Sequence, residues 1–175
     1  MFNFNVTDGM LKAWKELGDP LATAADIAFL ESSLGIKLPA DYVAFVTRYG
    51  FVEFGRDPER RMLFTYVIDN NGQRVTRQRE VQFLYNPAKL VRRYRFLTTT
   101  EDADDDTRPN TPPGFAPIGS DAEYGAVMLD IAANPGQIWF WPESNERWGL
   151  GDNVALGFVA DNFEDFINSL QPDPL

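Results

Sequence analysis

The apolar residues of this sequence change their spacing near Gly50, and this change limits the fold more than any other feature. Before Gly50 they recur every three or four residues, as on one face of a helix; Tyr42, Phe45 and Tyr49 are an example. After Gly50 the period moves towards two, as in strands with one buried face, for example at residues 62–68. Helices followed by a run of strands predict an α+β fold.

Capping residues and glycines set the ends of the predicted helices. A short polar side chain accepts the first free N–H groups of a helix, and glycine adopts the positive φ at which many helices stop. Pro39 suits the first position of one helix, and Asp161 is the expected cap of the last. These signals predict five helices: from Thr7 and Asp8 to Gly18, Thr23 to Gly35, Pro39 to Gly50, Asn86 to Leu97, and Asp161 to Leu170.

Short apolar runs between turn residues predict the strands. They cover residues 52–54, 62–68, 73–76, 81–85, 115–119, 125–131, 137–141 and 154–160. The last four are expected to form one antiparallel sheet, and residues 69–72 (DNNG) to make a hairpin. Residues 99–114 are polar, acidic and proline-bearing, which predicts an exposed loop within a single domain spanning residues 1–175. We therefore expect an antiparallel sheet packed against N-terminal helices and a C-terminal helix.

The sequence contains neither cysteine nor histidine. Their absence excludes disulfides, thiolate nucleophiles and imidazole bases, and nearly every zinc or copper site. A catalyst of this composition is restricted to carboxylates, Lys, Tyr, Ser and Thr. We find no phosphate-binding glycine loop and no oxyanion device, so we expect no enzyme, no cofactor and no metal.

The negative charge is concentrated in the second half of the chain. Residues 1–98 hold 14 Lys and Arg against 11 Asp and Glu, a net of +3, whereas residues 99–175 hold 2 against 15, a net of −13. An acidic half repels nucleic acid and anionic lipid and attracts a basic protein; solubility is the simpler explanation. With no signal peptide and no membrane-spanning run in the sequence, we expect a cytoplasmic protein.

Two blocks of residues resemble a known family, the SUKH superfamily, named in part after fungal cell-wall-synthesis regulators of the Smi/Knr type. Residues 27–50 (IAFLESSLGIKLPADYVAFVTRYG) have its helix ending in Leu-Gly, then Leu-Pro and an aromatic-rich helix ending in Gly. Its downstream strands and last helix resemble residues 117–166. The match covers roughly residues 23–170, apart from 56–114. The matching positions are Leu34, Gly35, Leu38, Pro39, Tyr42, Phe45, Gly50, Ile118, Gly119, Leu129, Asp130, Phe163 and Phe166.

The resemblance implies a protein-binding role. Bacterial members of the superfamily are mostly immunity proteins that neutralise toxins, often nucleases, by direct binding. We expect the matching residues to be structural, because helix stops, a helix start and core packing account for them. A regulatory scaffold of the cell-wall-signalling type is the alternative, and a carboxylate-based enzyme is a third.

Acidic residues and exposed aromatic residues are the candidate contacts with a basic protein toxin. Aromatic anchors within a charged rim are typical of binding hot spots. Alternation puts Trp139 and Trp141 on one face of their strand and Ile138 and Phe140 on the other, and we expect at least one of these pairs to be core. The candidates are Asp102, Asp104, Asp105, Asp106, Asp121, Glu123, Trp141, Glu143, Glu146 and Trp148.

Three features of the sequence also suggest other chemistry. The alternating Asp102, Asp104 and Asp106 resemble a calcium loop, but Thr107 and Pro113 replace its essential Gly and Glu. Asp121 and Glu123 form a carboxylate pair of the kind used in acid–base catalysis. A basic helix face suggests nucleic acid, but we expect no aromatic stacking platform beside it and favour a solvated face. That face carries Lys89, Arg92, Arg93 and Arg95.

Overall fold

Three helices open the chain and end close to where the sequence predicts. The computed structural model describes residues 1–17, 20–54, 61–70, 72–98 and 111–173. The capping box between Thr23 and Asp26 is present, and Gly35 stops its helix with a φ of 70°. Pro39 lies one position earlier than expected: with ψ at 137° it precedes the helix. The helices are α1 (Asp8–Leu17), α2 (Ala24–Leu34) and α3 (Ala40–Tyr49).

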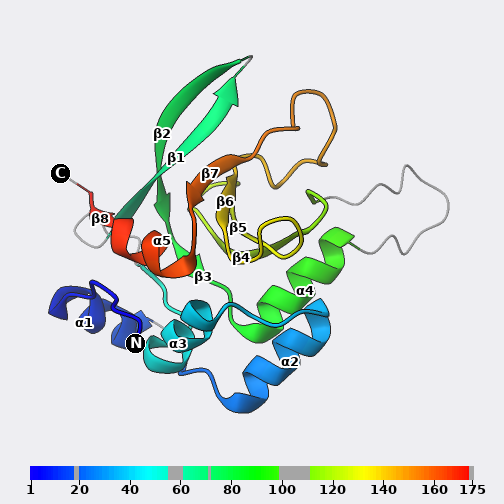
Figure 1. Ribbon diagram of the computed structural model, residues 1–175. Coiled ribbons are helices and arrows are strands. Elements are labelled where there is room, and N and C mark those ends of the chain that lie inside the picture. The colour runs from blue at the N-terminus through cyan, green and yellow to red at the C-terminus, as the bar shows by residue number, and fades with distance from the viewer. Residues whose placement is uncertain (18–19, 55–60, 71, 99–110, 174–175) are drawn as a thin grey trace.

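All the strands join one sheet in which every pairing is antiparallel. Its order is β2-β1-β7-β6-β5-β4-β3, with β8 beside β1. Helix α4 (Pro87–Thr98) lies between β3 and β4 in the chain, beside α2 (Figure 1). The strands are β1 (Met62–Asn70), β2 (Gln73–Val81), β3 (Phe83–Leu84), β4 (Phe115–Ser120), β5 (Ala126–Asp130), β6 (Ile138–Trp141), β7 (Gly157–Ala160) and β8 (Gln171–Pro172).

Four strand predictions were wrong in their extent. The predicted strand at 81–85 is divided between Val81, the last residue of β2, and the two-residue β3. Residues 73–81 form one strand instead of stopping at 76, because β2 is an edge strand held by backbone pairing with β1 and needs no alternating buried face. Residues 52–54 make only an isolated bridge, between Glu53 and Phe83. Residues 154–156 belong to a loop, so β7 starts at Gly157.

The predicted acidic loop at 99–114 lies mostly outside the described residues. Of its described part, Thr111 and Pro112 are buried and Pro113 is exposed, so the expectation of an exposed loop is wrong for Thr111 and Pro112. Within the described parts of the chain, no helix is long and apolar enough to cross a membrane.

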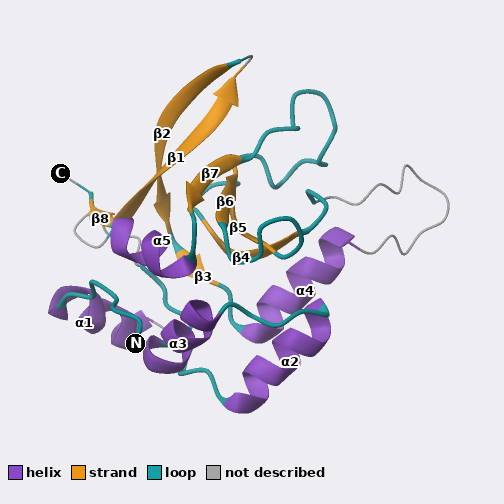
Figure 2. Cartoon of the chain, viewed as in Figure 1, coloured by secondary structure: helices purple, strands orange, loops and turns teal. Residues whose placement is uncertain are grey.

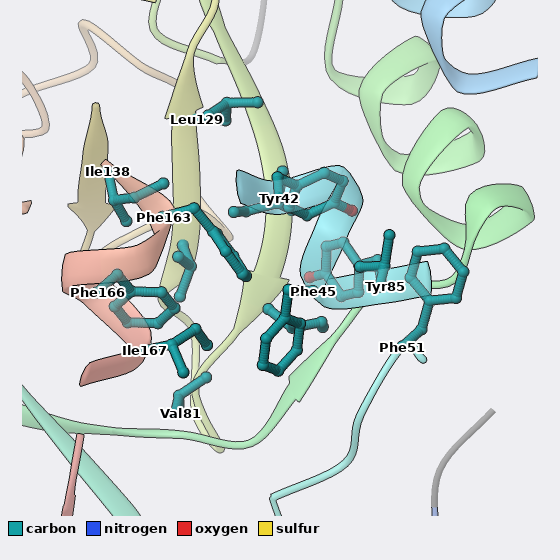
Figure 3. Packing of buried hydrophobic residues seen from close by; sticks show 14 of the residues in the cluster. Tyr42, Phe45, Phe51, Val81, Tyr85, Leu129, Ile138, Phe163, Phe166 and Ile167 are labelled. Carbon is teal, nitrogen blue, oxygen red and sulfur yellow. The ribbon is translucent and has the colours of Figure 1, made fainter. Parts of the chain in front are cut away.

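The central strands are buried on both faces of the sheet. Every residue of β5 is buried. Val127 and Leu129 face the helices and join the main core, whereas Ala126 and Met128 belong to a second cluster. Figure 3 shows the main core between the sheet, α3 and α5 (Phe163–Ser169). The arrangement therefore needs a second cover over the face that the helices leave open.

Helix α5 closes the main core by docking on α3. The Phe163 ring meets the Tyr42 ring edge to face at 5.0 Å. The buried Asp41 accepts a hydrogen bond from the backbone N–H of Glu164 at 2.9 Å. The predicted cap of this helix is wrong by one residue: Asn162 accepts from the N–H of Asp165, while Asp161 accepts from the Gln137 amide.

The cap assignment can be tested by comparing two neighbouring substitutions. Asn162→Ala should lower the free energy of unfolding by about 1 kcal/mol, because it removes the acceptor for a first-turn N–H group. Asp161→Ala, the matched control, should cost less than about 0.5 kcal/mol, since Asp161 is exposed and its bond to the Gln137 amide lies at the surface. Chemical denaturation measures both values, and the opposite order would restore Asp161 as the cap.

Candidate protein-binding surface

The loop between β6 and β7, residues 142–156, supplies the second cover of the sheet. Figure 2 shows it as a long connection that stands away from α1 and α3. Trp148 and Leu156 pack from this loop on the second cluster, whose fully buried centre is Trp141. The two tryptophan rings meet edge to face at 6.0 Å. The loop is thus an integral part of the packing.

Asn153 fixes the shape of this loop from inside. Its side-chain carbonyl accepts from the Trp141 indole N–H at 2.7 Å. Its amide nitrogen lies 3.1–3.2 Å from the backbone carbonyls of Glu143, Glu146 and Arg147. Asn153 is only 5% exposed, so these bonds satisfy polar groups that water does not reach. One side chain therefore ties both ends of the loop to the strand beneath it.

The outer side of the loop combines apolar side chains with carboxylates. Leu150 and Val154 are each 60% exposed, and neighbouring Tyr124 is 64% exposed. Ser144 joins Tyr124 to the loop, since its N–H and hydroxyl both donate to the Tyr124 carbonyl. Gly149 has a φ of 83°, which permits the tight turn that carries Leu150. We call this set the loop surface: Glu123, Tyr124, Glu143, Glu146, Leu150, Asp152 and Val154.

Two predicted contact residues are corrected by their burial. Trp141 is 0% exposed and Asp121 is 5% exposed, so neither is available to a partner. Alternation along the strand assigns Trp141 to one face of the sheet. It does not predict the loop that covers this face. Of the two tryptophans, Trp148 is the less buried, but it packs on Trp141 and is only partly accessible.

Of the remaining predicted contacts, some are exposed and others lie outside the described residues. Glu143 and Glu146 are exposed on the loop, and Glu123 is exposed beside Tyr124. Sequence reasoning missed Tyr124, Leu150 and Val154, although an apolar residue between two glycines in a polar link was a usable signal. The acidic run Asp102, Asp104, Asp105 and Asp106 lies outside the described residues, and with it the candidate calcium loop. Within the described ranges, no group of three or more carboxylates could hold a metal ion.

Asp121 and Glu123 do not act as a facing pair. One Asp121 oxygen accepts from the N–H groups of Glu123 and Gly125, at 2.9 and 2.7 Å, and so holds the turn between β4 and β5. The Glu123 carboxylate instead lies 3.2 Å from the Arg79 guanidinium, near the surface. Burial raises the pKa of Asp121, and the two N–H groups and Arg79 oppose this effect. The arrangement supports a turn rather than general acid–base chemistry.

The residues of the two sequence blocks are structural where the structure describes them. A Cβ on Gly119 would come within 2.6 Å of the Phe83 carbonyl, so β3 and β4 pair only with glycine there. Asp130 is buried and accepts from the backbone N–H groups of Ala132, Ala133 and Asn134. Leu34, Leu38, Tyr42, Phe45, Ile118, Leu129, Phe163 and Phe166 all belong to the main core.

Removing the Asn153 side chain should loosen the loop surface. Asn153→Ala leaves the buried Trp141 N–H without its acceptor and removes the side-chain donor to the loop carbonyls, which should cost about 1–3 kcal/mol of the free energy of unfolding. Amide hydrogen exchange should accelerate within residues 142–156 before it does so in β5. Asn145→Ala is the matched control, because Asn145 is an exposed residue of the same loop. Equal stability of the two variants would contradict the role given to Asn153.

The buried carboxyl of Asp121 should make stability depend on pH. Its pKa is raised above the ordinary value of 3.8, so the folded state binds this proton more tightly than the unfolded state. Its contribution is full below pH 3.8 and is lost as the pH rises through the folded-state pKa. Asp121→Asn keeps the acceptor oxygen and removes the charge.

The Asn variant should therefore be at least as stable as the wild type at pH 7, with an advantage that shrinks as the pH falls towards 3.8. Denaturation curves over this range measure it. Glu123→Gln, which removes an exposed carboxylate from the same turn, is the control. An advantage that grows on acidification would contradict the effect of burial.

Comparison with known proteins agrees with this architecture. The model of the SMI1 / KNR4 family (SUKH-1) matches residues 21–169. No curated protein and no solved structure gives a significant match. The family match includes the helices α2, α3, α4 and α5 and the whole main sheet path. Because it covers most of the sequence, the chain belongs to the SMI1 / KNR4 family (SUKH-1), in agreement with the resemblance of its two motif blocks.

Proposed function

We propose that this chain is a non-catalytic immunity protein that neutralises a basic protein toxin, such as a nuclease, by direct binding through the loop surface. The observation that carries the proposal is the pairing of exposed Leu150, Val154 and Tyr124 with surrounding carboxylates. Apolar anchors inside a charged rim supply affinity and specificity together. The immunity role itself is what the SUKH resemblance implies. The family membership supports the resemblance.

Charge gives the loop surface a preference for basic partners. The loop carries Glu143, Glu146 and Asp152 against Arg147, and Glu123 adds a further carboxylate beside it. Such a surface raises the rate of encounter with a positively charged cleft. A toxin that binds nucleic acid has a cleft of this sign, because it must attract phosphates. Inhibition would then be steric, with the loop blocking access to the cleft.

Rigidity favours the same role. The Asn153 bonds and the packing of Trp148 hold the loop before any partner arrives. A surface that is ordered in the free protein loses little conformational entropy on binding. The proposal that the chain does no catalysis draws on the absence of cysteine and histidine and on the structural use of Asp121.

Co-expression tests the immunity role directly. The chain should restore growth to cells that express a toxin domain encoded beside its gene, and the two should elute together on gel filtration. Rescue without a complex would contradict inhibition by binding. Failure with every neighbouring toxin would favour the regulatory scaffold.

Reversing the charge of the loop surface should slow binding. The double variant Glu143→Lys/Glu146→Lys should lower the association rate with the toxin roughly tenfold at low salt, and much less at high salt, because screening removes the steering. Surface plasmon resonance measures both rates. Asp8→Lys/Glu16→Lys, at two exposed positions of α1, is the charge-matched control and should bind as the wild type does.

Leu150→Ala separates the apolar contribution from the charge, because it removes the apolar side chain and adds no charge. It should raise the dissociation rate more than it lowers the association rate, because it removes an anchor from the centre of the surface. An unchanged dissociation rate would mean that the toxin binds elsewhere on the chain.

A further inference from the structure

The basic face of α4 is flanked by aromatic rings. Sequence alone predicted no stacking platform beside it, and that prediction is wrong. Tyr85, which follows β3, and Phe96, in the last turn of α4, line a recess of about 380 Å³ together with Lys89, Arg92 and Arg93. This volume lies at the small end of the range for small-molecule sites. The proposed function uses none of these five residues.

Aromatic and backbone contacts hold two of the cations in place. The Lys89 ammonium lies 3.7 Å from the centre of the Phe83 ring and 4.8 Å from that of Tyr85. The Arg93 guanidinium lies 5.9 Å from the centre of the Phe96 ring and donates a hydrogen bond to the Ser144 carbonyl at 3.1 Å. Their positive charges are therefore positioned at the recess before a ligand binds.

The recess has the opposite charge to the chain as a whole. Three of its five lining residues are cationic and none is acidic, although the chain carries a net charge of −10. Asp121 acts electrostatically on Tyr85 but is itself buried, so it does not occupy the opening. A ligand with a compact negative charge matches this lining, and guanidinium groups bind phosphate oxygens in a bidentate manner.

Phe96 supplies the second half of the recognition. It is 69% exposed, the most exposed aromatic side chain of the helices, and core packing does not account for it. A flat aromatic ligand would stack on it, as nucleobases stack on exposed aromatic side chains. We propose that this recess binds a mononucleotide, with the phosphate at Lys89, Arg92 and Arg93 and the base on Phe96.

A mononucleotide fits better than a longer anion. The recess is small, and the acidic second half of the chain repels an extended nucleic-acid strand. An acidic peptide would satisfy the cations but offers no flat ring to Phe96. These two ligands predict different results in the same titration.

The test is a titration of the isotope-labelled chain with AMP, followed by the amide NMR signals of residues 85–97. We expect saturable shifts with a dissociation constant of about 1 mM or tighter. Adenosine and inorganic phosphate should each bind at least tenfold more weakly than AMP, because each lacks one of the two recognised groups. Arg92→Ala and Phe96→Ala should each weaken AMP binding roughly tenfold.

Matched controls keep the result specific to the recess. Arg95→Ala removes the same charge from the same helix but from outside the recess, so it should change AMP binding less than about twofold. Arg92 and Phe96 are exposed, and circular dichroism checks that both variants remain folded. Arg93 is avoided as a test position because its loss would also remove the hydrogen bond to the Ser144 carbonyl.

Several outcomes would overturn the proposal. If AMP causes no saturable shift, or if Arg95→Ala weakens AMP binding as much as Arg92→Ala does, the recess is not a specific site. Phosphate that binds as tightly as AMP would remove the role of Phe96. A glutamate-rich peptide that displaces AMP at a lower concentration would assign the recess to an acidic protein segment instead.

Discussion

The burial of the central strand on both faces governs much of this structure. All five residues of β5 are inaccessible, so the sheet must be covered twice. The helices cover one face through contacts such as Phe163 on Tyr42. On the Met128 and Trp141 side the loop at 142–156 packs instead, together with Leu97 from the end of α4. A connection that would otherwise be a surface loop is thereby made part of the core.

Because its inner side packs on the core, the loop can present its outer side as the ordered surface proposed for binding. Its inner side is fixed by Trp148 packing and by the Asn153 hydrogen bonds, and these leave its outer side free to vary. Substitutions at Glu143, Leu150 or Val154 alter the proposed binding surface without removing core volume, because these side chains are exposed. The scaffold and this surface can therefore vary independently.

The two surfaces of interest have opposite charge and meet at one hydrogen bond. Arg93 belongs to the basic recess on α4, and its guanidinium donates to the carbonyl of Ser144, at the base of the loop. Ser144 in turn holds Tyr124 against that loop. The acidic loop surface and the basic recess are therefore adjacent but chemically separate, which suits them to different ligands.

Local signals in the sequence determined the helices and the positions of most strands along the chain, because caps, glycine stops and alternation act over a few residues. The two motif blocks indicated the family. They also placed Trp139 with Trp141 on one face and Ile138 with Phe140 on the other, as the two clusters confirm. Alternation does not say what covers each face. Phe96 lies four residues after Arg92 on the same helix, so helical periodicity could have placed it beside the basic face of α4. Only the tertiary structure buried Trp141, gave Asn153 its four polar partners and extended β2 beside β1, because each of these depends on contacts that the local pattern does not specify.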